Sequence, residues 1–350
     1  MLGIDRRALS IAWTLFLFAL TLLVLYGAGR TIIVFALAVI FAHLLSPIVG
    51  FIERLLPRRM PRVASLSIVY VALLGVLVGV SIPLGSRISH EAASLARKLP
   101  DVIQSDPLSK LPIPSSLEPW RPEVTDFVHD RLTEIGQRIG PMLSSLGTQI
   151  VSGIGALLTI ILIPILAFFY LKDGAMIRDA IVESFDAPRR PLVDELFSEV
   201  HLLLIQYIRA LVLLSLATFV FYSIFLGITG GPFPVLLSGI ASLLEFIPAL
   251  GPFAGAVIIF IVSAANGYPH LVVLVLFLAI YRIFQDYVLN PYLMSAGVEV
   301  HPLAVLFGVL AGAQLLGIPG MFFSVPAIAV LRLVINRLRR RQIAPPTPAP

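Results

Sequence analysis

The chain has 350 residues, of which 58% are hydrophobic and 13% are charged, and its mean hydropathy is +0.97. It is far more apolar than a soluble globular protein, so we expect an integral membrane protein with several spans. The net charge is only +5 and the arginines gather at the ends of apolar runs, which argues against nucleic-acid binding. The absence of cysteine excludes disulfides, cysteine-ligated metals and thiol catalysis.

The N-terminal region, residues 1–85, is predicted to contain three membrane spans, at 11–26, 31–52 and 63–83. Arginines precede the first span and fill the loop at 53–62 between the second and the third. Because cytoplasmic loops are enriched in Lys and Arg, we expect the N-terminus and this loop to be cytoplasmic.

Residues 86–148 have a mixed composition and are predicted to form an extramembrane insert on the outer side. Its first part shows an apolar face at helical spacing, formed by Ile88, Ala92, Leu95, Leu99 and Val102. A second amphipathic helix is predicted at 124–146, after a proline-rich break. Such apolar stripes favour packing against the membrane bundle or against a second subunit.

Residues 149–336 are predicted to form a C-terminal membrane core. Plain spans are expected at 153–171, 212–228 and 271–289, and an amphipathic helix at 189–206 leads into the second of them. Two longer apolar stretches, 235–265 and 303–335, are interrupted by proline and glycine. Each stretch is long enough either to cross the membrane once with a kink or to form a re-entrant hairpin, and hydropathy does not distinguish the two. The tail at 337–350 is basic and then proline-rich, and we expect its end to be disordered.

The sequence LLEFIPALGPFAG at 243–255 interrupts the first long stretch. It places Glu245, Pro248, Gly251 and Pro252 inside an apolar segment. A carboxylate in hydrocarbon costs several kcal/mol unless it faces protein or water, and each proline removes a backbone donor from a helix. Irregular backbone at membrane depth persists only where it is buried in protein or lines a wet cavity. The sequence therefore predicts a broken helix or re-entrant turn beside a transport pathway, with a kinked structural helix as the alternative.

Further polar residues lie in or beside apolar segments. Three of them, Arg282, Gln285 and Asp286, share one helical face, which we expect to be lined by protein. Asn290 follows, Arg209 stands at the start of a span, and the second long stretch is broken at Gly317, Pro319 and Gly320.

Glu245 and Asp286 are the candidate coupling carboxylates, because burial disfavours the ionised form and allows a carboxyl group to take up and release a proton. A static Arg282–Asp286 ion pair is the structural alternative for Asp286. Gln285 and Asn290 are candidate contacts for a hydroxylated solute, or partners of exposed backbone near the break. Arg209 is either a candidate for the pathway or a side chain that reaches the membrane interface.

Several motifs, in this order and spacing, resemble the autoinducer-2 exporter family of bacterial inner-membrane transporters. They are LKDG at 171–174, QYIRALV at 206–212, EFIPALGP at 245–252, QDYVLNP at 285–291 and the long run at 297–331. The resemblance implies about eight membrane segments, no ATPase domain and export of a small solute. Family members commonly have glycine where this chain has Ala210.

These observations predict an all-α polytopic membrane protein that acts as a secondary or passive transporter and exports a small polar solute, such as an autoinducer-like signal or a metabolite. The alternatives are a sodium/proton-type antiporter using the same carboxylates and a membrane scaffold that does not transport. We expect no enzymatic activity, no cofactor, no metal site and no nucleic-acid partner. The expected partners are the solute, H⁺ or Na⁺ and the lipid bilayer, with a homo-oligomer left open. The expected location is the bacterial cytoplasmic membrane, with both termini cytoplasmic.

Overall fold

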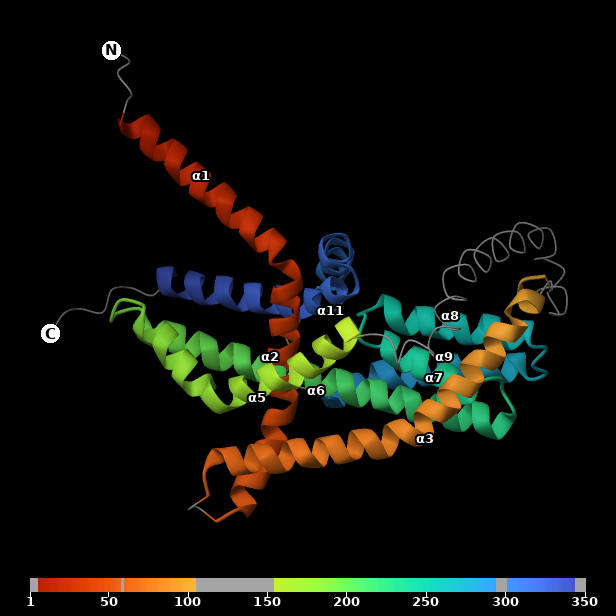
Figure 1. Ribbon diagram of the computed structural model, residues 1–350. Coiled ribbons are helices and arrows are strands. Elements are labelled where there is room, and N and C mark those ends of the chain that lie inside the picture. The colour runs from red at the N-terminus through yellow and green to blue at the C-terminus, as the bar shows by residue number, and fades with distance from the viewer. Residues whose placement is uncertain (1–5, 58–59, 105–153, 294–300, 344–350) are drawn as a thin grey trace.

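The computed structural model describes residues 6–57, 60–104, 154–293 and 301–343, and within these ranges every regular element is a helix. The elements are α1 (Arg6–Gly27), α2 (Gly29–Leu55), α3 (Arg62–Gln104), α5 (Ile154–Glu183), α6 (Arg190–Thr229), α7 (Pro234–Leu244), α8 (Leu250–Ala265), α9 (Leu271–Phe284), η2 (Gln285–Leu289), α10 (Asn290–Leu293) and α11 (Pro302–Ile343). The all-α prediction is confirmed. Figure 1 shows α1 projecting away from the remaining helices.

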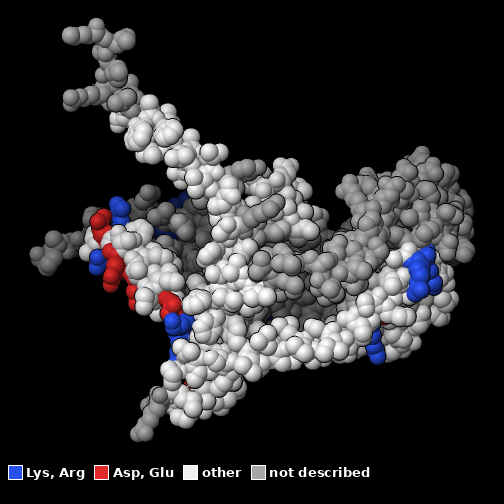
Figure 2. All heavy atoms as spheres, viewed as in Figure 1, with Lys and Arg blue, Asp and Glu red and all other residues white. Residues whose placement is uncertain are grey.

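Among the described residues, five helices are long and apolar enough to cross a membrane. They are Thr31–Leu55, Arg62–Lys98, Arg190–Thr229, Leu271–Leu293 and Pro302–Arg337, and shorter apolar helices occur at Ser10–Thr21, Pro234–Leu244 and Leu250–Ala265. Charged side chains gather over the connection between α5 and α6 and at the far end of α3, with a broad uncharged surface between them (Figure 2). This distribution confirms a polytopic helical membrane protein.

Helix α3 is continuous from the predicted third span into the first part of the predicted insert. Ala92 and Leu95, on the predicted apolar face, are buried against the start of α7. Glu91 accepts a hydrogen bond of 2.8 Å from the backbone N–H of Leu236 in the first turn of α7. The first part of the insert therefore packs on this chain's own bundle. The predicted second helix at 124–146 lies outside the described residues.

Helix α6 connects the charged end of the molecule to the rest of the bundle. It includes both the predicted amphipathic helix and the following span in one element. Its acidic residues at this end are paired: Asp194 with Arg178 of α5, and Glu195 and Glu199 with Arg337 of α11. These ion pairs attach both neighbouring helices to the same end of α6.

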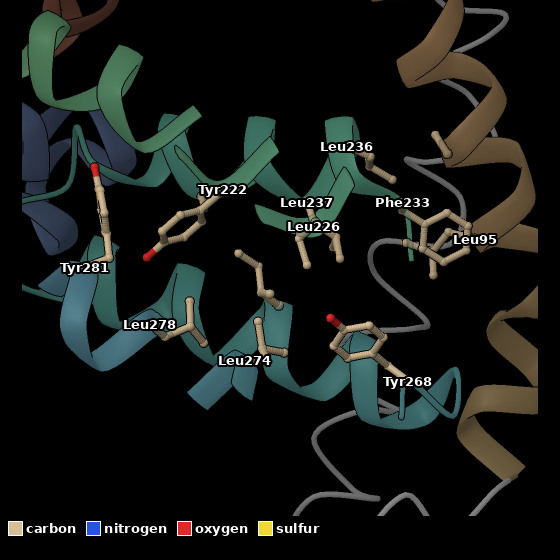
Figure 3. Close-up of a cluster of buried hydrophobic side chains, with 13 residues drawn as sticks. Leu95, Tyr222, Leu226, Phe233, Leu236, Leu237, Tyr268, Leu274, Leu278 and Tyr281 are labelled. Carbon is tan, nitrogen blue, oxygen red and sulfur yellow. The ribbon is translucent and has the colours of Figure 1, made fainter. Parts of the chain in front are cut away.

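One hydrophobic core lies where α6, α7, α8 and α9 meet the end of α3. Its members include Tyr222 and Leu226 of α6, Leu237 of α7, and Leu274 and Leu278 of α9, which point toward one another in Figure 3. A second core joins α2, the start of α3 and α5. The first core fixes the positions of the elements that carry the candidate site.

Both interrupted stretches fold as helical hairpins. A Cβ atom on Gly255 of α8 would lie 3.1 Å from Ala241 of α7, so the two arms of the first hairpin are in close contact. In α11 the chain turns at Gly317, where φ is 64°, and Gly312 and Gly320 pack against each other across the turn. The structure therefore supports the hairpin alternative over a single kinked crossing. The proline-rich end at 344–350 lies outside the described residues.

Candidate functional site

The tip of the α7–α8 hairpin has unusual backbone geometry. Ala249 has φ 63° and ψ −49°, and the N–H of Leu250 donates to the carbonyl of Pro248 over 2.7 Å. This is a classic γ-turn, a rare and strained conformation for a residue other than glycine. Gly251 follows, where a Cβ atom would collide with the carbonyl oxygen of Leu244. Pro252 lies in the first turn of α8, where a missing N–H costs little.

Glu245 is buried at the start of this tip, with 5% of its surface exposed. Its two oxygen atoms accept hydrogen bonds from the hydroxyl of Thr218, at 2.9 Å, and from the side-chain amide of Gln285, at 2.8 Å. Thr218 also lies 2.9 Å from the hydroxyl of Tyr281. Because the single Thr218 proton goes to Glu245, Tyr281 donates to Thr218. Helix α6 and element η2 thus both supply donors to this buried carboxylate.

The polar face predicted around residue 285 lies at a π-helical segment. Element η2 continues α9 and ends where the N–H of Asn290 bonds the carbonyl of Gln285. π-helical turns are rare and occur often at functional sites. Arg282 Nε lies 2.8 Å from Asp286 Oδ2, and Asn290 donates to the other Asp286 oxygen over 3.2 Å. The buried residue Gln285 faces Glu245, whereas the ion pair lies on a more exposed part of the helix.

A cavity of about 370 Å³, which we call the Glu245 cavity, lies between α6, the hairpin tip, η2 and α11. Its apolar lining includes Leu211 and Leu214 of α6, and Val325, Pro326 and Ala329 of α11. Its polar lining consists of Gln206, Tyr207, Glu245, Arg282, Gln285 and Asn290. The Tyr207 hydroxyl is buried and has no hydrogen-bond partner among the described residues. A mainly apolar cavity with a few convergent polar groups is the usual form of a small-molecule site.

A second cavity, of about 400 Å³, lies between α8 and α9, and we call it the α8–α9 cavity. It is lined mostly by apolar side chains, such as Phe253, Val257 and Leu278. The two cavities share four lining residues, Ala249, Pro252, Arg282 and Gln285. The strained turn and the start of the π-helical segment therefore form the boundary between the two cavities.

Most of the predicted site residues come together here. Glu245, Pro248, Pro252, Arg282, Gln285 and Asn290 line the Glu245 cavity, Gly251 supports its hairpin tip, and Asp286 pairs with Arg282. Arg209 is exposed on α6 and does not line the cavity. Gly317, Pro319 and Gly320 form the turn region of the other hairpin, whose second arm supplies the α11 part of the lining.

Sequence reasoning missed Thr218, Tyr281, Gln206 and Tyr207 as site residues. Single threonines and tyrosines are common in apolar helices, so Thr218 and Tyr281 carry no signal of their own. Gln206 and Tyr207 did carry one, because both belong to the QYIRALV motif at the start of a span.

A bundle of apolar helices with broken segments, around a mainly apolar cavity with a few convergent polar groups, is the architecture of a membrane transport protein. The AI-2E family transporter model matches residues 15–340, nearly the whole chain. The chain therefore belongs to this family, as its motifs predicted, and this membership points away from enzymatic activity.

Two relatives from Bacillus subtilis strain 168 match along most of their length. "Putative transport protein YueF" is 26% identical over 328 residues, covering 89% of this chain and 88% of the relative. "Putative transport protein YrrI" is 25% identical over 317 residues, covering 87% and 86%. "Putative transport protein MT0215" of Mycobacterium tuberculosis strain CDC 1551 / Oshkosh is 28% identical over 171 residues, covering 49% and 47%. All three names describe transport proteins.

Proposed function

We propose that the protein exports a small polar solute, such as an autoinducer-like signal or a metabolite, through the Glu245 cavity. The observation that carries the proposal is a buried carboxylate at a broken helix, beside a cavity whose remaining polar groups converge from α6, α9, η2 and α10. Transport proteins commonly place solute sites at such discontinuous helices. The family, which comprises transporters, supports the same reading.

Glu245 is the coupling group in this proposal. It is the carboxylate in the Glu245 cavity's lining, and burial makes its charge costly unless donors remain in place. A proton on the Glu245 oxygen that faces Thr218 would make that oxygen a donor, so Thr218 would accept instead of donate. Proton uptake at this oxygen thus reverses the hydrogen bond between Glu245 and α6, which is how a proton would alter the solute site.

The variant Glu245→Gln tests this coupling role, because glutamine keeps the shape and hydrogen-bonding capacity of the side chain but does not titrate. In purified protein reconstituted in vesicles, we expect normal insertion and the loss of the pH dependence of solute flux. Glu183→Gln, at an exposed position at the end of α5, is the control and should keep the wild-type pH profile. An unchanged rate and pH profile in Glu245→Gln would remove Glu245 from the coupling role.

The solute itself is best found by comparing the metabolites in the medium of cells with and without the protein. Flux that collapses with a protonophore and ignores sodium supports proton-coupled export. Sodium-dependent proton movement in vesicles, without solute flux, would instead identify an antiporter. The proposed setting for export is the bacterial cytoplasmic membrane with both termini on the cytoplasmic side.

A further inference from the structure

We propose that the transported solute is a small organic anion with hydroxyl groups, and that Arg282 is the residue that selects its charge. This inference rests on the proposed transport function and narrows its substrate class. It follows from which polar groups of the two cavities are already satisfied and which remain free.

Arg282 stands at the boundary of both cavities. It lines the Glu245 cavity and the α8–α9 cavity, whereas its ionic partner Asp286 lines neither. In the α8–α9 cavity, Arg282 is the only charged residue of the described lining. A solute that passes from one cavity to the other therefore meets this guanidinium in mainly apolar surroundings, where charge interactions are strong.

The guanidinium has Nη donors that form no hydrogen bond to the described residues. Its contact with Asp286 uses Nε, and the hydrogen bonds of the described residues include none from its two Nη atoms. A planar guanidinium with free Nη donors matches the two oxygens of a carboxylate or another oxyanion. A cationic solute would instead be repelled by the positive charge of Arg282.

Both oxygen atoms of Glu245 accept hydrogen bonds, from Thr218 and Gln285, so part of its negative charge is already compensated before a solute enters. Apart from Arg282, the lining groups of the Glu245 cavity that have no side-chain partner among the described residues are neutral. Gln206 has no side-chain partner among the described residues, and the Tyr207 hydroxyl is buried without one. Such groups donate to and accept from hydroxyl groups. The cavity therefore fits a hydroxylated molecule whose charged end is an anion.

The test uses probes with one carbon skeleton and different charge: lactate, propane-1,2-diol and 1-amino-2-propanol. A ligand that binds the folded protein raises its thermal unfolding midpoint, so each probe is titrated against purified full-length protein in detergent. We expect lactate to raise the midpoint at lower concentration than the diol and the amine to have no effect.

Variants at position 282 separate charge recognition from folding. Arg282→Gln should weaken lactate binding about 10- to 100-fold, whereas Arg282→Lys should retain part of it. Arg282→Gln leaves the Asp286 carboxylate without its ionic partner. The double variant Arg282→Gln/Asp286→Asn removes both charges and is expected to fold. It should also lose the preference for lactate over the diol. Arg332→Gln, at an exposed arginine of α11 that lines neither cavity, is the matched control and should bind lactate normally.

The outcomes distinguish this inference from the proposed transport function. Equal stabilisation by lactate and the diol, stabilisation by none of the probes, or unchanged lactate binding in Arg282→Gln would overturn the anion assignment. Flux of the neutral diol in vesicles, with a pH dependence that is lost in Glu245→Gln, would overturn the anion assignment while supporting the proposed transport. Lactate binding that depends on Arg282 without flux of any solute would keep the anion site and overturn transport.

Discussion

Thr218 connects the buried carboxylate to Tyr281 and so holds two helices to the hairpin tip. Its hydroxyl donates to Glu245 and accepts from Tyr281, and the residue is almost completely buried. Thr218→Val keeps the shape but leaves Glu245 with one donor and the Tyr281 hydroxyl without a partner. We expect a loss of about 1–2 kcal/mol in stability, seen as a lower thermal unfolding midpoint of purified protein.

Thr229→Val on the same helix is the control for this substitution. Among the described residues, the Thr229 hydroxyl bonds only the carbonyl of Phe225, four residues earlier in its own helix. Removing such a bond changes stability little. A Thr218→Val protein as stable as Thr229→Val would show that the Glu245 contacts contribute nothing measurable to the fold.

Arg282 and Asp286 form an ion pair at i, i+4 spacing. Removing one partner leaves the other charge unpaired in mainly apolar surroundings, so each single variant should be less stable than the double. We expect a coupling of about 1 kcal/mol in a double-mutant cycle of Arg282→Gln and Asp286→Asn, measured by unfolding in detergent. A double variant no more stable than the worse single variant would contradict the pairing.

The polar residues of the site were easier to predict from the sequence the more free energy it costs to place their side chains in a membrane. Glu245, Arg282 and Asp286 stand out because a charged side chain in an apolar segment is energetically costly and therefore usually has a function. Thr218 and Tyr281 do not, because a hydroxyl group can bond to its own helix or lie among apolar groups at small cost. Only the tertiary structure, which places α6 against the hairpin and η2, shows that both belong to the Glu245 network.

At the scale of elements, the closest approach between the arms of the α7–α8 hairpin is at Gly251. Gly251 packs so close to the carbonyl of Leu244 that an added Cβ atom would force the arms apart. We expect Gly251→Ala to cost about 1–3 kcal/mol and to lower transport at every pH, measured by thermal unfolding and vesicle flux.

Gly239 of α7 offers the control for Gly251, because it lies in the same hairpin and an added Cβ atom meets nothing within 4 Å. Gly239→Ala should be neutral or slightly stabilising, since alanine favours the helix. If both variants behave alike, the close approach at Gly251 does not hold the hairpin together.

The sequence indicated both breaks but not their geometry. Prolines and glycines show where a helix is interrupted, yet a kinked crossing and a hairpin need the same residues and similar lengths. The choice depends on contacts between the arms, such as Gly255 with Ala241 and Gly312 with Gly320. The π-helical segment at 285–289 was likewise not predictable, because one extra residue in a turn leaves no distinct pattern over so short a stretch.

At the scale of the whole molecule, the arginine-rich connections and the hairpins together predict on which side of the membrane each connection between helices lies. The arginine-rich loop at 53–62 and the α5–α6 connection are expected on the cytoplasmic side. With α7 and α8 as a hairpin, the turn after α6 and the turn before α9 lie on one side, so α9 starts from the outer face. A single crossing by α7 and α8 would place those two turns on opposite sides.

Cysteine labelling tests this topology directly, because the chain has no cysteine of its own. We expect Thr229→Cys and His270→Cys, at the two turns, to react with an impermeant maleimide added outside intact cells. Ser184→Cys, exposed in the α5–α6 connection, should react only after the membrane is opened. Labelling of Thr229→Cys from outside together with His270→Cys from the cytoplasm alone would mean that α7 and α8 cross the membrane completely. The boundary between the two cavities would then belong to a continuous crossing helix, and Ala249 would no longer be the tip of a re-entrant turn.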